Sequence, residues 1–120
     1  MKPNRKQLEK WIAALRSGEY KQYIGALQTS KGYCCLGVAC RALIPKSKLY
    51  LSTEEHEKES FLEGILPEQQ PNAPKWLKYI NDDFYSITRK KLTVLNDEKK
   101  LTFDEIADLL ELVYIHKILD

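Results

Sequence analysis

Apolar residues near the beginning of the chain recur at the spacing of a helix. Asn4 is placed to cap that helix, and Gly18 is placed to end it. Four apolar side chains fall on one face between these two residues: Leu8, Trp11, Ile12 and Leu15. The pattern predicts an amphipathic helix that packs this face against a core.

The C-terminal part carries the clearest helix signal. Thr102 and Glu105 form the T-x-x-E pattern of a capping box, and Leu101 lies at staple spacing from Ile106. Four apolar residues then follow along one side: Phe103, Ile106, Leu110 and Val113. Together these features predict a helix over residues 103–118.

Residues 20–35 interrupt the helical spacing with closely placed aromatic residues. "TSKG" at residues 29–32 is a turn signal, which predicts a β-hairpin with arms from Tyr23 to Gln28 and from Gly32 to Cys34. A helix over residues 35–43 should follow, and Pro45 should end it.

The middle of the chain gives weaker signals. "KLYLST" at residues 48–53 is typical of a short strand, and the acidic "EEHEKES" at residues 54–60 is typical of a solvated helical turn or loop. "LPEQQPNAP" at residues 66–74 contains three of the five prolines and predicts an irregular connection.

Two further segments precede the C-terminal helix. Residues 75–87 fit either a short helix or an edge strand, and residues 90–100 are expected to end in a turn at Asn96 and Asp97. The predicted fold class is therefore α+β: one helix-rich domain over residues 1–120 with a small antiparallel sheet.

Composition places the chain among soluble globular proteins. It has 43% hydrophobic and 30% charged residues, and no apolar run reaches the roughly 18 residues of a membrane span. The first residues lack the apolar core of a secretory signal, so we expect a cytoplasmic protein. Three cysteines, an odd number, argue against a disulfide framework there.

Charge is distributed unevenly. Residues 1–50 carry a net charge of +8, whereas residues 51–120 carry −6. The two halves attract one another or a symmetry mate, or else the first half forms an electropositive surface for an anion. "RKK" at residues 89–91 is expected to be a solvated face, because three charges are too few to predict nucleic-acid binding.

The three cysteines lie close together, at Cys34, Cys35 and Cys40. Zinc sites need a second pair of ligands, and adjacent cysteines rarely bind one ion together. The only histidines, His56 and His116, are far away in sequence. We therefore expect no metal site, and no cofactor is predicted.

Two readings of the cysteines remain open. Cys34 or Cys35 near a helix N-terminus would have the lowered pKa of a nucleophile, with a histidine and Asn96 or Asp97 completing a catalytic set. Alternatively, these cysteines are buried and pack as small hydrophobic residues.

The same stretch has the composition of an anion site. A helix that begins after a glycine-bearing turn can bind a phosphate at its N-terminus, and tyrosines can stack on a base. The P-loop pattern is absent. Asn96 and Asp97 are either turn formers or ligands for a ribose or amide. The candidate ligand-binding residues are Tyr20, Tyr23, Lys31, Gly32, Tyr33, Cys35, Arg41, Asn96 and Asp97.

Several motifs in this order resemble a pattern in small bacteriophage and prophage proteins. They are "W-x3-L-x-S-G-x-Y" from Trp11 to Tyr20, "G-x-L" from Gly25 to Leu27, "G-Y-C-C-L-G-V-x-C" from Gly32 to Cys40, "L-x-x-L-N-D" from Leu92 to Asp97 and "F-x-E-I-A-x-x-L-E" from Phe103 to Glu111. The resemblance implies a phage-borne accessory protein in the bacterial cytosol. It carries no agreed activity, so no catalytic residue is transferred.

The leading hypothesis is a non-enzymatic protein that binds an anionic small molecule, in particular a nucleotide signal of host immunity, by analogy with other small phage proteins. A homodimer or higher oligomer would pair the basic half of one chain with the acidic half of another. Membrane and nucleic-acid partners are not expected. The alternatives are an enzyme that uses Cys34 or Cys35, and an inhibitor that binds a host enzyme through "STEEHEKES".

Overall fold

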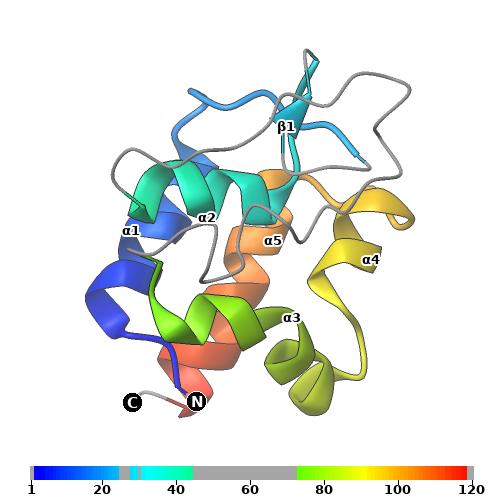
Figure 1. The fold of residues 1–120 in the computed structure, drawn as a ribbon. Helices are drawn as coiled ribbons and strands as arrows, with labels where there is room; N and C mark the ends of the chain where they lie inside the picture. The colour runs from blue at the N-terminus through cyan, green and yellow to red at the C-terminus, as the bar shows by residue number, and fades with distance from the viewer. Residues whose placement is uncertain (1, 25–27, 30, 45–72, 119–120) are drawn as a thin grey trace.

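A computed structural model describes residues 2–24, 28–29, 31–44 and 73–118. Helices make up most of these residues (Figure 1). In chain order the elements are α1 (Arg5–Arg16), β1 (Gln28–Thr29), β2 (Gly32–Tyr33), α2 (Cys35–Leu43), α3 (Lys75–Thr88), α4 (Leu92–Asp97), α5 (Phe103–Leu110) and η2 (Glu111–Ile118).

Helix α1 confirms the first predicted element. The Asn4 side chain accepts a hydrogen bond from the backbone N–H of Gln7 at 3.0 Å, which caps the helix. The four apolar residues of its predicted face are all buried. Gly18 follows the helix with a φ of +78°, a conformation that glycine adopts without a steric penalty.

The predicted β-hairpin is reduced to four residues in the described part of the chain. β1 and β2 pair antiparallel, with Gln28 opposite Tyr33. The prediction that the first arm of the hairpin begins at Tyr23 is wrong. At this point the chain instead forms a parallel bridge, between Gln22 and Tyr33. The strand after the turn has no room to extend, since Cys34 already caps α2. The helix-rich part of the predicted fold class is confirmed, whereas an extended antiparallel hairpin is not found in the described residues.

The prediction for α2 is confirmed, the choice left open for α3 is decided, and the prediction for α4 is corrected. α2 begins and ends where the sequence predicted, with Ile44 as its C-cap. For residues 75–87 the helical alternative is the right one, since α3 buries four residues at helical spacing: Trp76, Leu77, Ile80 and Phe84. The turn expected at Asn96 is wrong, because both Asn96 and Asp97 belong to α4.

The C-terminal helix changes its winding partway. Thr102 and Glu105 form both hydrogen bonds of the predicted capping box. α5 ends at Leu110, and the chain continues as the wider π-helix η2. Within η2 the Tyr114 hydroxyl donates to the Asp83 carboxylate of α3 at 2.8 Å. Burial and this carboxylate raise the pKa of Tyr114 above its ordinary value.

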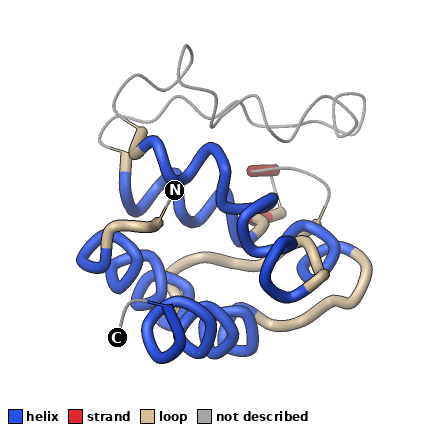
Figure 2. The backbone as a smooth tube through the Cα atoms, turned by 90° about the horizontal axis from the view of Figure 1, so that it is seen from below, coloured by secondary structure: helices blue, strands red, loops and turns tan. Residues whose placement is uncertain are grey.

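The helices share one hydrophobic core, in which α1 contacts both α2 and α5. Seen from below, the strands form only a small element at one side (Figure 2). Trp11 is fully buried in this core; its ring centre lies 6.2 Å from that of Trp76, and its indole N–H donates to the Cys35 carbonyl at 2.9 Å. None of the helices in the described ranges combines the length and the apolar composition needed to cross a membrane.

Several sequence predictions fall outside the described residues. They concern Pro45, "KLYLST", the acidic stretch with His56, and residues 66–72 of the proline-rich connection.

Candidate functional site

Five of the predicted ligand-binding residues come from two neighbouring segments. Tyr20 and Tyr23 belong to the segment after α1, and Lys31, Gly32 and Tyr33 to the turn and strand before α2. Backbone hydrogen bonds join the two segments, from Tyr23 N–H to Tyr33 O at 2.7 Å and from Tyr33 N–H to Lys21 O at 2.8 Å. The Tyr20 and Tyr33 rings pack edge to face at 5.3 Å. The structure therefore brings these residues together.

The side chains of Lys31 and Tyr23 form a direct pair. The Lys31 ammonium lies 5.4 Å from the centre of the Tyr23 ring and 3.4 Å from its hydroxyl oxygen. A cation over an aromatic face is attracted by the ring's negative electrostatic potential. Lys31 is exposed and Tyr23 is half-buried, so solvent reaches both groups. Lys21, next to these residues on the parallel segment, is also exposed.

Gly32 allows the two segments to approach closely. A Cβ atom at this position would lie 2.3 Å from the Lys21 carbonyl oxygen, and the φ of Gly32 is +151°. Gly32 is itself buried. Its lack of a side chain therefore serves the packing of backbone on backbone, rather than the phosphate cradle that the sequence suggested.

Asn96 and Gln22 form a hydrogen-bonded network that holds the segment after α1. Asn96 is only 1% exposed; its amide N–H groups donate to the Tyr23 carbonyl at 2.9 Å and to the Asp97 carboxylate at 2.8 Å. Its amide oxygen accepts from Gln22 at 2.9 Å. Asn96 and Asp97 thus bind protein groups, and this structural role differs from the ligand contacts that the sequence analysis considered.

Gln22 extends this network to α5 and was missed by the sequence analysis. Its amide nitrogen also donates to the Leu101 carbonyl at 2.7 Å, and its amide oxygen accepts from the Phe103 N–H at 3.1 Å. These partners lie about 80 positions away in the sequence, at residues 101 and 103. A single glutamine between a lysine and a tyrosine gives no local signal for such contacts.

All three cysteines are buried. The Cys35 thiol donates to the Leu92 carbonyl at a sulfur–oxygen distance of 3.9 Å. Burial raises the pKa of Cys34 well above its usual range and raises those of Cys35 and Cys40 to about 12. A nucleophile needs the opposite shift, so these thiols have the properties of packing residues. In the described ranges no three His, Cys, Asp or Glu side chains gather as a metal site would require.

The N-terminus of α2 is closed to an anion. The Cys34 sulfur accepts the Gly37 N–H at 3.4 Å, and the first three residues of the helix are buried. Arg41 lies in the last turn of α2, six residues after Cys35 and thus about 9 Å along the axis. The expected cradle of Cys35 N–H and Arg41 around one phosphate is therefore not formed.

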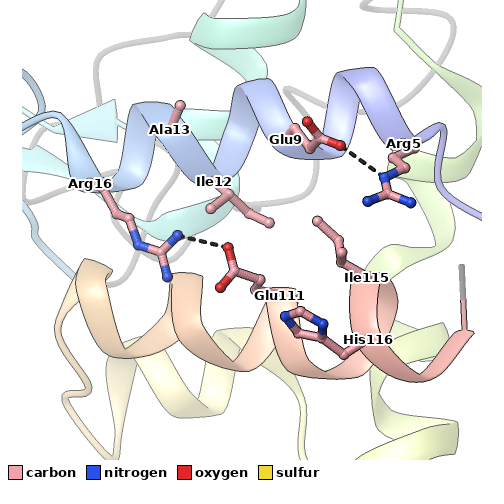
Figure 3. A pocket seen from close by; sticks show the side chains of 8 residues that line it. All are labelled: Arg5, Glu9, Ile12, Ala13, Arg16, Glu111, Ile115 and His116. Carbon is pink, nitrogen blue, oxygen red and sulfur yellow. Dashed lines mark hydrogen bonds and ion pairs between the residues drawn. The ribbon is translucent and has the colours of Figure 1, made fainter. Parts of the chain in front are cut away.

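A groove with a volume of about 550 Å³ lies elsewhere, between α1 and η2 (Figure 3). Ile12 and Ile115 point into it from the two helices. Arg5 pairs with Glu9 at 2.9 Å, and Arg16 pairs with Glu111 at 3.1 Å and with Asp108. His116 also lines the groove, away from the Cys35 thiol, which faces Leu92. None of the predicted ligand-binding residues lines it.

Comparisons with known proteins identify the family. Neither a search of curated proteins nor a search of solved structures finds a match. A family profile described as "Domain of unknown function (DUF8296)" matches residues 1–114. Because this match spans nearly the whole sequence, the chain belongs to the DUF8296 family.

Proposed function

We propose that the protein is a non-enzymatic binding protein for an anionic small molecule. The site consists of Tyr23 and Lys31, with Lys21 and Tyr20 beside them. The observation that carries the proposal is the Lys31 ammonium, which lies 5.4 Å from the Tyr23 ring centre. A cation next to an accessible aromatic ring matches the two parts of a nucleotide, the phosphate and the base.

The frame behind these side chains supports binding with little reorganisation. Tyr23 is fixed at its backbone N–H by Tyr33 and at its carbonyl by Asn96. Such preorganisation reduces the entropy that is lost when a ligand binds. Catalysis is not part of the proposal, since the buried cysteines have raised pKa values and lack the character of a nucleophile.

The ligand class that we infer is a nucleotide-type signal of host immunity, which the protein would sequester in the bacterial cytosol. This part of the proposal rests on the resemblance of the motifs to phage and prophage proteins. Sequestration requires only tight and reversible binding, which suits a site without a catalytic group.

The proposal is tested with a panel of nucleotides that includes cyclic dinucleotides and ADP-ribose derivatives. Each compound is incubated with the purified protein, the free ligand is measured, and the protein is then heat-denatured. We expect one compound to disappear from solution and to return chemically unchanged. A compound that returns altered would establish an enzyme, and an unchanged panel would leave a protein partner as the better explanation.

Variants locate the binding site. Lys31→Glu should weaken binding of the retained compound at least tenfold, whereas Lys10→Glu, the same change on the exposed side of α1, should not. Tyr23→Leu should weaken binding, while Tyr23→Phe keeps the ring and should bind nearly as well. If Arg41→Glu abolishes binding and Lys31→Glu does not, the ligand contacts the end of α2 and the proposed site is wrong.

A further inference from the structure

Helix α3 has an outer face on which exposed cations and exposed tyrosines lie together. Its buried side is apolar, as described above. With 3.6 residues per turn, the opposite arc carries Lys75, Lys78, Tyr79, Asp82, Tyr85 and Arg89, and all six are exposed. Lys90 and Lys91 follow directly and are also exposed. We call Lys75, Lys78, Tyr79, Tyr85, Arg89, Lys90 and Lys91 the α3 basic face.

The charge of this face is strongly positive. Five cations are exposed, and Asp82 is the exposed carboxylate among them. Asp83 is half-buried and accepts the Tyr114 hydroxyl, so it is already engaged by the core. Among the described residues, none of the five cations forms an ion pair. Their positive charge is thus directed to solvent, and an anionic partner would complement it.

Two tyrosines stand out on the same face. Tyr79 is 46% exposed and Tyr85 is 43% exposed, so both rings present a large apolar surface to solvent. The Lys78 ammonium lies 5.3 Å from the centre of the Tyr79 ring. Exposed aromatic rings beside cations are typical of surfaces that stack on nucleic-acid bases and hold the phosphates between them.

The end of the face is held in a defined conformation. Arg89 adopts a left-handed φ of 64° and ends the helix, and its N–H bonds the Tyr85 carbonyl at 2.7 Å. The Thr88 hydroxyl accepts the Lys90 N–H at 3.1 Å. From Lys75 to Arg89 the helix rises about 21 Å. That length suits roughly four nucleotides of an extended single strand, the lower end of known site sizes.

We propose that the α3 basic face binds single-stranded nucleic acid without sequence preference. The cations contact successive phosphates, and Tyr79 and Tyr85 stack on bases. This revises the expectation from the sequence, which counted only the three charges of residues 89–91. The fold adds two lysines and two tyrosines on the helix that Arg89 ends. An acidic protein would satisfy the cations but would leave the two exposed rings without a role.

The experiment measures fluorescence anisotropy of a labelled 20-nucleotide oligothymidylate with the full chain, from 50 to 200 mM NaCl. Affinity should fall with salt, with a log–log slope of roughly −0.7 for each phosphate contacted. Lys75→Ala/Lys78→Ala should weaken binding and make the slope shallower by about 1.4. Tyr79→Ala and Tyr85→Ala should each weaken binding about five- to tenfold without changing the slope.

Lys6→Ala/Lys10→Ala on α1 is the matched control, because it removes the same charge from another exposed helix. Circular dichroism establishes that each variant is folded. The proposal is overturned if the oligonucleotide does not bind at 50 mM NaCl, or if both double variants weaken binding equally. It is also overturned if the tyrosine variants bind like the original protein and polyglutamate competes equally well, because the face would then be a general acid-binding surface.

Discussion

Asn96 has an unusual position for an uncharged polar residue. It lies in the last turn of α4, almost fully buried, and its side chain bonds three protein groups: Gln22, the Tyr23 carbonyl and Asp97. A buried amide stabilises a fold only when its donors and acceptors are paired. Asn96 therefore fixes the segment of Tyr23 against α4, and any ligand site at Tyr23 depends on it.

Replacement of Asn96 by alanine tests this role. We expect Asn96→Ala to lower the free energy of unfolding by about 2 to 3 kcal/mol, since it leaves buried partners unpaired. Urea denaturation measures the change. Asn81→Ala is the control. The Asn81 amide is half-buried and forms hydrogen bonds of 3.3 Å, so its loss should lower the free energy of unfolding by less. Equal losses would contradict a special role for Asn96.

Gly32 and Gly18 form a natural comparison, because both have positive φ angles of +151° and +78°. An added Cβ meets nothing within 4 Å at Gly18 but lies 2.3 Å from the Lys21 oxygen at Gly32. We expect Gly18→Ala to cost about 1 kcal/mol from backbone strain, and Gly32→Ala about 3 kcal/mol because overpacking adds to the strain. Thermal unfolding of both variants tests this difference. Similar melting temperatures would contradict the close approach of Gly32 to the Lys21 backbone.

For individual residues, the sequence indicated which positions are special but not which contacts they make. It singled out Gly32 as part of a phosphate cradle and Asn96 as either a turn former or a ligand contact, but it did not show which protein groups these residues contact. Two of the contacts that decide their roles join distant positions: Gly32 lies against Lys21, 11 positions away, and Asn96 bonds Gln22, 74 positions away. Such contacts arise when segments distant in sequence pack together, and local residue patterns do not reveal them.

Elements with strong local signals were predicted well. α1, α2 and the start of α5 each have a cap and a periodic apolar face. For α3 the sequence alone fits both a helix and a strand, because its closely placed apolar and aromatic residues match both periods. For the end of α4 the sequence predicts a turn at Asn96 and Asp97, because Asn and Asp favour turns in isolation. The core overrides that preference, since Leu92 and Leu95 are buried on the same helix.

The capping box of α5 gives a prediction at the scale of one helix. Thr102→Ala removes the oxygen that accepts the Glu105 N–H at 3.1 Å. We expect a loss of about 1 kcal/mol in the free energy of unfolding. Ser86→Ala removes a hydroxyl from the exposed side of α3 and should change stability by less than about 0.5 kcal/mol. A Thr102→Ala variant as stable as the Ser86→Ala variant would show that the cap contributes nothing.

For the whole molecule, the buried thiols couple stability to pH. In the unfolded chain they ionise near pH 9, whereas in the fold the pKa values of Cys35 and Cys40 are about 12 and that of Cys34 is also raised. Above pH 9 the unfolded state therefore binds fewer protons than the folded state. Stability is complete below that pH and is lost as pH rises toward 12.

Urea denaturation at pH 7.5 and pH 9.5 measures this coupling. We expect the free energy of unfolding to fall by roughly 1 kcal/mol per thiol at the higher pH. In Cys40→Ala, which keeps two of the three thiols, the fall should be about two-thirds as large. The same stability at both pH values would mean that the thiols ionise within the fold, which would reopen a role for them as nucleophiles.

The position of α1 has a consequence for how the protein is made. The Trp11 indole bonds residue 35 and packs on Trp76, and Arg16 pairs with Asp108 and Glu111, more than 90 positions later. At about 5 to 20 residues per second, a ribosome needs roughly 5 to 20 seconds to add those positions. During that interval the first helix is synthesised but has no C-terminal partner. The apolar face of α1 is then a target for chaperones. The fold is complete only when the C-terminal helix has been synthesised and packs against α1.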